Sequence, residues 1–140
     1  MAMTMQVDIV SAEENVFSGT AQYLSARAAN GEVGILPRHA PMLLQLQPGE
    51  VRVTNEAGEQ EMYYVSGGVL EVQPHIVTIL SDTAVRAADL DEAAAAEAKR
   101  RAEEALKDQK TDIDFAKTQA ELLEAIAQLR TIRRLREQIR

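Results

Sequence analysis

The sequence changes character abruptly near residue 88, and this change constrains the fold more than any other feature. Before it, short runs of Val, Ile, Leu and Tyr are interrupted by Gly, Pro and Asn, as in short strands joined by tight turns. From residue 89 onward there is no Gly or Pro, and Ala, Glu, Lys, Arg and Leu predominate, as in helices. The sequence therefore predicts a β domain over residues 1–86 and a helical domain over residues 89–140.

The β domain is predicted to contain about ten short strands. Asn30-Gly31 is its strongest hairpin signal, because both residue types tolerate positive φ angles. Pro37 and Pro41 mark a fixed loop, and Pro48-Gly49 marks a turn. Strand-like segments between such signals, roughly 6–12 residues apart, indicate an antiparallel β-sandwich or flattened barrel.

The helical domain is predicted to form an antiparallel hairpin. Asp89 is the expected N-cap of a first helix, with Glu92 at its third helical position, and this helix should run to about Lys107. A short polar connector over residues 108–112 leads to a second helix, and short connectors join antiparallel neighbours. The fold class is therefore a segregated α+β architecture, a β-sandwich followed by a two-helix hairpin.

We expect the two helices to pack closely but weakly. The apolar face of the first helix is predicted to consist largely of alanines, namely Ala94, Ala98, Ala102 and Ala105. The second helix should face it with Phe115, Leu122, Ile126, Leu129, Ile132, Leu135 and Ile139. A buried Ala contributes only about 0.8 kcal/mol against about 1.5–3 kcal/mol for Leu. The second helix should therefore be held marginally and be able to change partners.

Composition argues against several classes of function. The absence of Cys excludes disulfides, thiolate zinc sites and a Cys nucleophile. The two histidines, His39 and His75, fall in loops and lack metal-ligand spacing, so we predict no metal site and no catalytic residues. A net charge of −7 and the lack of Trp disfavour nucleic-acid binding. With no signal-peptide pattern and no apolar run long enough to span a membrane, a soluble cytoplasmic protein is expected.

The last twelve residues carry a cationic cluster on this acidic chain. They hold a single acid, Glu137, and five arginines, Arg130, Arg133, Arg134, Arg136 and Arg140. One or two cations would suit a solvated helix C-terminus, which remains the alternative interpretation. Five in so short a segment repel one another and favour an acidic partner surface.

Seven segments taken in order resemble the ε subunit family of bacterial F-type ATP synthases. They are VSAE at 10–13, FSG at 17–19, GEVGILPRHAP at 31–41, PG at 48–49, YVSGGVLEV at 64–72, DTA at 82–84 and DLDE at 89–92. Each is weak alone, but their order and spacing span essentially the whole chain. The family fold, a ten-stranded β-sandwich with a two-helix C-terminal domain, agrees with the fold predicted from the residues.

This resemblance implies a non-catalytic subunit of the central rotor stalk of a proton-translocating ATP synthase. Such a subunit binds the γ subunit and sits on the c-ring, peripheral to the membrane on the cytoplasmic face of the bacterial inner membrane. In the family, the loop matching residues 30–33 contacts the c-ring, which points to Glu32. The sandwich face that contacts γ matches Ser11, His39 and Met42.

The resemblance also implies that the helical hairpin regulates hydrolysis. In the family the hairpin changes from a compact to an extended form, in which the second helix enters the catalytic head of α and β subunits and blocks ATP hydrolysis. Arg130, Arg133 and Arg134 match positions that face acidic segments of the β subunit.

ATP binding by the hairpin is predicted to be weak or absent, so no cofactor is expected. Family members that bind ATP carry an arginine four residues after the Ile/Leu that opens their motif, and here that position is Ala94. Asp91 and Arg101 match the motif, but the second-helix positions are Glu124 and Gln128. Acidic or neutral groups in place of cations do not hold a triphosphate.

An alternative hypothesis is a free-standing β-sandwich adaptor whose helical hairpin binds an unrelated acidic protein. The two hypotheses differ in whether the chain has a stoichiometric γ partner.

Overall fold

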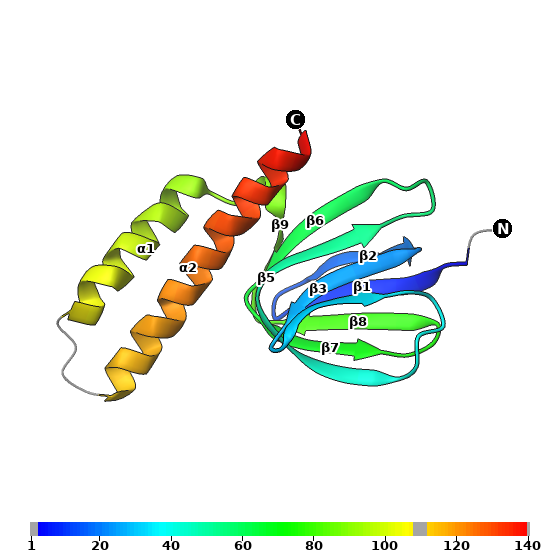
Figure 1. The fold of residues 1–140 in the computed structure, drawn as a ribbon, viewed down its shortest axis with the longest axis horizontal. Helices are drawn as coiled ribbons and strands as arrows, with labels where there is room; N and C mark the ends of the chain where they lie inside the picture. The colour runs from blue at the N-terminus through cyan, green and yellow to red at the C-terminus, as the bar shows by residue number, and fades with distance from the viewer. Residues whose placement is uncertain (1–2, 108–111, 140) are drawn as a thin grey trace. The chain divides into compact units, whose positions relative to one another are not determined.

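The computed structural model describes residues 3–107 and 112–139 (Figure 1). The chain divides into two compact units, Met1–Ala87 and Ala88–Arg140, next to the composition change near residue 88.

The first unit is a β-sandwich with nine strands in the described residues, close to the ten expected. The strands are β1 (Met5–Ser11), β2 (Asn15–Ala21), β3 (Tyr23–Ala28), β4 (Gly31–Ile35), β5 (Met42–Thr54), β6 (Gln60–Val65), β7 (Gly68–Val72), β8 (Ile76–Ser81) and β9 (Ala84–Arg86). The predicted hairpin between β3 and β4 is present, but its two-residue loop is Ala29-Asn30, one residue earlier than predicted, because Ala28 pairs with Gly31. The predicted fold class is confirmed.

The long strand β5 connects the two layers of the sandwich. Its first half pairs with β7, next to β8, β1 and β2, and its second half pairs with β6, which in turn pairs with β9. The turn predicted at Pro48-Gly49 is wrong, because the chain passes through these residues within one continuous strand. The pairing is antiparallel throughout the described strands except between β1 and β8, which are parallel and 70 residues apart along the chain at the pair Gln6–Ile76.

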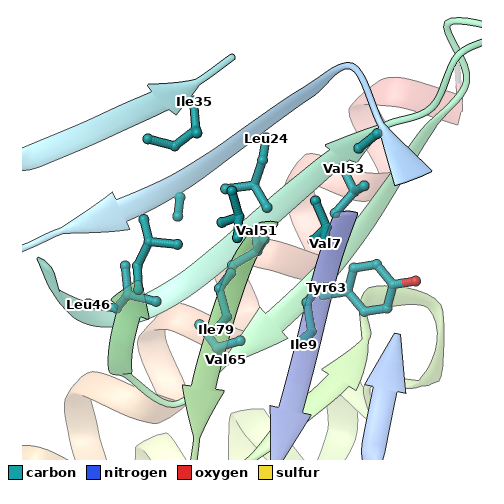
Figure 2. Packing of buried hydrophobic residues seen from close by; sticks show 14 of the residues in the cluster. Val7, Ile9, Leu24, Ile35, Leu46, Val51, Val53, Tyr63, Val65 and Ile79 are labelled. Atoms are coloured by element: carbon teal, nitrogen blue, oxygen red, sulfur yellow. The ribbon is translucent and has the colours of Figure 1, made fainter. Parts of the chain in front are cut away.

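The sandwich core consists of large apolar side chains from every layer (Figure 2). Strand β1 contributes alternate residues, Met5, Val7 and Ile9, as its period-2 pattern predicts. Leu24 on β3 and Ile79 on β8 are fully buried as well. A full apolar side chain removed from water contributes roughly 1.5–3 kcal/mol, so this core gives the sandwich its stability.

The second unit is an antiparallel hairpin of α1 (Glu92–Lys107) and α2 (Asp112–Ile139) (Figure 1). The N-cap of α1 is Asp91, whose Oδ1 accepts a hydrogen bond from the Ala94 N–H at 3.1 Å. The prediction of Asp89 as N-cap is wrong by two residues, because Ala87–Asp89 forms a separate 3₁₀ turn, η1. In the described part of the chain, neither helix is long and apolar enough to cross a membrane.

Small residues form the contact between the two helices. The buried residues of α1 are Ala95 and Ala102, and a row on α2 with the same spacing of seven buries Thr118, Ala125 and Ile132. The predicted alanine face is therefore only partly right, because Ala94 and Ala98 are exposed. Of the larger residues expected to face α1, Phe115 and Ile126 are exposed, whereas Ile132 is buried and Leu122, Leu129 and Leu135 are half-buried. Ile139 was also expected on this face, but its side chain is not among those that the structure describes.

Candidate partner-binding surfaces

Glu32 and Met42 lie at the same hollow, although they were assigned to different partners. The hollow has a volume of about 390 Å³ and is lined by residues 28–33 and 42–45. Glu32 follows the β3–β4 turn, where Gly31 has a φ of +128° that side-chain-bearing residues rarely adopt. Glu32 is exposed, and Met42 packs partly against the core at the start of β5. The two residues therefore belong to one continuous surface.

Ser11 closes the turn between β1 and β2. Its Oγ accepts hydrogen bonds from the backbone N–H groups of Glu13 and Glu14, at 3.3 and 3.2 Å. It also lines a hollow of about 280 Å³ together with Ser66, Gly67, Gly68 and Leu80. The Ser11 hydroxyl is thus occupied by hydrogen bonds within the β1–β2 turn. A partner would contact this turn as a whole and not the hydroxyl alone.

The glycines of this hollow are required by packing. Gly68 has a φ of +114°, and a Cβ there would lie 2.0 Å from the carbonyl oxygen of Leu80. The Ser66 Oγ accepts a hydrogen bond from the Thr83 N–H at 3.1 Å. The Ser66-Gly67-Gly68 segment therefore joins strands closely and does not form a phosphate-binding loop.

His39 lies in the loop between Pro37 and Pro41 and is half-buried. Its Nδ1 lies 2.8 Å from the carbonyl oxygen of Ala40, so an Nδ1–H donates there. The backbone N–H of His39 donates to the carbonyl oxygen of Leu36 at 3.2 Å. The ring is therefore oriented by one hydrogen bond to the next residue, and the backbone bond closes the loop around it.

The outer face of the β1, β8, β7 and β5 layer carries exposed apolar residues among polar ones such as Asp8, Thr78 and Glu71, and the sequence patterns did not indicate these apolar residues. Leu43 is 69% exposed, Leu80 50% and Val69 37%. Val69 and Leu80 are cross-strand partners, and Leu80 is also the partner of Val10 on β1. Exposed apolar residues that are adjacent on neighbouring strands mark an interaction surface. The sequence signal that could have indicated this surface is the presence of apolar residues on both faces of β8.

The α2 arginines differ in their surroundings. Of the three proposed contacts, Arg133 is exposed, whereas Arg130 and Arg134 are half-buried. Arg136, which was not among them, donates hydrogen bonds to both carboxylate oxygens of Glu92 in the first turn of α1; Arg136 Nη1 lies 3.2 Å from Oε1. Because this pair joins the ends of the two helices across the hairpin, part of the cationic cluster is engaged within the unit.

Asp91 and Arg101 are not brought together into a nucleotide site. Asp91 caps α1, whereas the Arg101 Nε lies 3.1 Å from Glu97. Hydrogen bonds from Arg100 are the main cause that lowers the pKa of Glu97. Arg101 lines a groove of about 410 Å³ between the helices together with Glu121, Glu124, Ala125 and Gln128. Two carboxylates and one guanidinium in this groove are the wrong charge for a triphosphate.

The last strand of the sandwich is fixed by a cluster on β6 and β9. The Arg86 guanidinium lies 3.5 Å from Glu61 and 5.7 Å from the centre of the Tyr63 ring. The Tyr63 hydroxyl donates to Glu61, and burial is the main cause that raises the pKa of Tyr63. Arg86, the last residue of β9, is therefore held by contacts with β6 at the point where the chain leaves the sandwich.

Comparison with known proteins covers both units. Residues 4–87 match the family described as "ATP synthase, Delta/Epsilon chain, beta-sandwich domain", and residues 88–133 match "ATP synthase, Delta/Epsilon chain, long alpha-helix domain". The chain is 61% identical to the ATP synthase epsilon chain of Nitrosococcus oceani, over 99% of each chain. It is 64% identical to the ATP synthase epsilon chain of Thioalkalivibrio sulfidiphilus, over 100% of each chain.

Two solved structures share the fold. One is a chain of the Euglena gracilis mitochondrial ATP synthase, with a TM-score of 0.78, 23% identity and coverage of 89% of this chain and 78% of that chain. The other is a chain from the central stalk and c-ring of the Tetrahymena thermophila mitochondrial ATP synthase, with a TM-score of 0.62, 14% identity and coverage of 93% and 97%.

Proposed function

The chain belongs to the ATP synthase delta/epsilon chain family, and on this premise we propose that it is a non-catalytic central-stalk subunit of a proton-translocating ATP synthase. It couples the catalytic head to the rotor ring and restrains ATP hydrolysis. The observation that carries this proposal is the full-length similarity, above 60% identity, to proteins named ATP synthase epsilon chain. A free-standing adaptor is disfavoured, because both units match the family in the family's order.

The γ subunit is the proposed partner of the sandwich. The exposed apolar residues Leu43, Val69 and Leu80 on the outer face offer part of the area that such a contact buries, and burying exposed apolar surface contributes about 25 cal/mol per Å². Ser11, His39 and Met42 are the proposed polar and peripheral contacts of the same partner. The hydrogen bond between the His39 ring and Ala40 supports this role, since it orients the ring before binding and lowers the cost of ordering it.

The c-ring is the proposed partner of the β3–β4 turn. Glu32 is exposed at this turn and offers a carboxylate to a polar group of the ring. Glu32 and Met42 share one hollow, which supports a position where two partners meet. With the c-ring as its partner, the proposed location of the chain is the cytoplasmic face of the bacterial inner membrane, where the complex holds it.

The hairpin is the proposed regulatory element, and the α and β subunits of the catalytic head are its partners. Its helices meet largely through alanine and threonine side chains, together with Ile132, so separating them costs less than opening a core of large apolar residues. Moving a two-state equilibrium from 1:99 to 99:1 takes about 5.5 kcal/mol of differential binding. Charge-assisted hydrogen bonds from Arg130, Arg133 and Arg134 to acidic groups, at roughly 1.5–3 kcal/mol each, would supply this.

ATP is not proposed as a ligand of the hairpin. Ala94 replaces the motif arginine, and the groove that holds Arg101 also holds Glu121 and Glu124. Isothermal titration of the full chain with ATP should give no micromolar binding.

Co-purification tests the assignment. The full chain, tagged and expressed in its own organism, should recover γ in equal amounts together with the catalytic head and the c-ring. Recovery of the chain as a monomer, without affinity for γ, would contradict the proposed function and favour the adaptor.

A further inference from the structure

Arg38 adopts a backbone conformation that its residue type disfavours. Among the residues that the structure describes, it is the only non-glycine residue with a positive φ, at 66°. A bulky residue in this left-handed region loses free energy relative to glycine or asparagine, and such residues cluster at functional sites.

The loop around Arg38 is held firmly in this conformation. The Arg38 N–H donates to the carbonyl oxygen of Pro74 in the β7–β8 turn at 2.8 Å, and the His39 N–H donates to Leu36. Pro37 and Pro41 restrict the backbone on either side. The left-handed conformation is therefore a fixed feature of the loop.

No contact within the sandwich explains why an arginine occupies this position. The Arg38 side chain is exposed, and within the described part of the chain it has no hydrogen bond or ion pair. Its neighbours include Leu36, 60% exposed. Residues 36–41 and 72–76, which meet here, contain no acidic residue although the chain carries a net charge of −7. Arg38 is the one formally charged residue of these two segments, and the nearby Glu71 carboxylate accepts a hydrogen bond from the Gln73 side chain at 2.9 Å.

We propose that Arg38 is a partner-contact residue whose guanidinium binds an aspartate or glutamate of the stalk subunit seated on the sandwich. This inference rests on the proposed function and names a contact within it. A guanidinium is suited to bidentate binding of a carboxylate. A loop that is already ordered loses little conformational freedom on binding, so the strained backbone is retained for recognition.

The test separates recognition from stability with Arg38→Asn. Asparagine tolerates positive φ, so the thermal midpoint of the full chain should stay unchanged or rise by a few degrees. Affinity for the ATP synthase complex depleted of this subunit, measured by fluorescence titration, should fall about tenfold or more. The loss should shrink at high salt, because charge interactions are screened.

Two further variants serve as controls. Arg38→Lys keeps the charge and should retain part of the affinity, whereas Lys117→Gln, on an exposed position of α2, should bind as the wild type does. Wild-type affinity of Arg38→Asn would overturn the proposal. So would a weaker binding that accompanies a lower thermal midpoint, since the residue would then be structural.

The remaining outcomes are equally decisive. If the wild-type chain fails to bind the depleted complex at all, the proposed function fails, and this inference fails with it. If Arg38 instead governs binding to phosphatidylglycerol vesicles and not to the complex, the guanidinium serves a lipid surface and the protein contact is overturned.

Discussion

The sandwich and the hairpin are stabilised by different means. Tyr63, Ile9 and Leu24 are fully buried in the sandwich, and each removes a large apolar area from water. In the hairpin the facing residues include Ala95, Ala102 and Ala125, which bury about one methyl group each. The difference teaches that one short chain can combine a rigid platform with an element held loosely enough to change its contacts.

The polar interactions sharpen the same contrast. Arg100 bridges Glu97 and Glu104 along α1 at 2.6 and 2.8 Å, and all three side chains are exposed. Exposed ion pairs contribute about 0–1 kcal/mol each and weaken with salt. They support helix formation in α1 but add little to the contact between the helices.

Deleting residues 129–140 should have the largest effect, because it removes the cationic end of α2 and part of its buried row. ATP hydrolysis by the assembled complex should rise several-fold, while the sandwich still supports assembly. The measurement is the steady-state hydrolysis rate of complexes reconstituted with the wild-type or truncated chain. Unchanged hydrolysis would contradict a regulatory role of the hairpin and leave the stalk assignment intact.

Leu24→Ala should destabilise the sandwich by roughly 2–5 kcal/mol, because it removes a fully buried side chain from a close-packed core. Urea unfolding should show the change in the transition of the sandwich. Leu43→Ala, on the exposed outer face, is the matched control and should cost much less. Equal costs at the two sites would break the contrast between core and outer face.

Ala125→Leu should destabilise the hairpin by roughly 1–3 kcal/mol, because a larger side chain cannot fit where small residues let the helices approach. Paired labels on α1 and α2 should report separation of the helices, with no change in the sandwich. Ala120→Leu, at an exposed position of α2, is the control. If Ala125→Leu made the hairpin more stable, the contact between α1 and α2 would have to contain unfilled space that the larger side chain occupies.

The smallest effect is expected for the ion pair between Glu92 and Arg136. A double-mutant cycle with Glu92→Gln and Arg136→Gln should give a coupling of about 1 kcal/mol or less, since both side chains are about half exposed. The coupling should vanish in 1 M salt. A coupling of several kcal/mol that persists in salt would identify the pair as a principal lock of the hairpin.

The fold could be predicted because its signals are local. The loss of Gly and Pro after residue 88 separates the two units, and Asn30-Gly31 requires a tight turn. Two features could not be found this way, since they depend on tertiary contacts. Strand β5 continues through Pro48-Gly49, and β1 pairs in parallel with a strand far along the chain.

The candidate surfaces were less predictable than the fold. Sequence patterns place an N-cap only to within one or two residues, and the observed cap, Asp91, lies two residues after the predicted Asp89. Alanines occur on every face of α1, and composition cannot decide which of them is buried. Contacts that join distant residues, such as Glu92 with Arg136, leave no local pattern.

Hydrogen exchange of the full chain, free and within the assembled complex, tests the contrast between the two units most directly. Amides of β1 and β8 should exchange by global unfolding alone, whereas those of α2 should exchange orders of magnitude faster in the free chain. Within the complex, protection of α2 should change with its partner. Protection of α2 equal to that of the sandwich core, in both states, would contradict a loosely held hairpin.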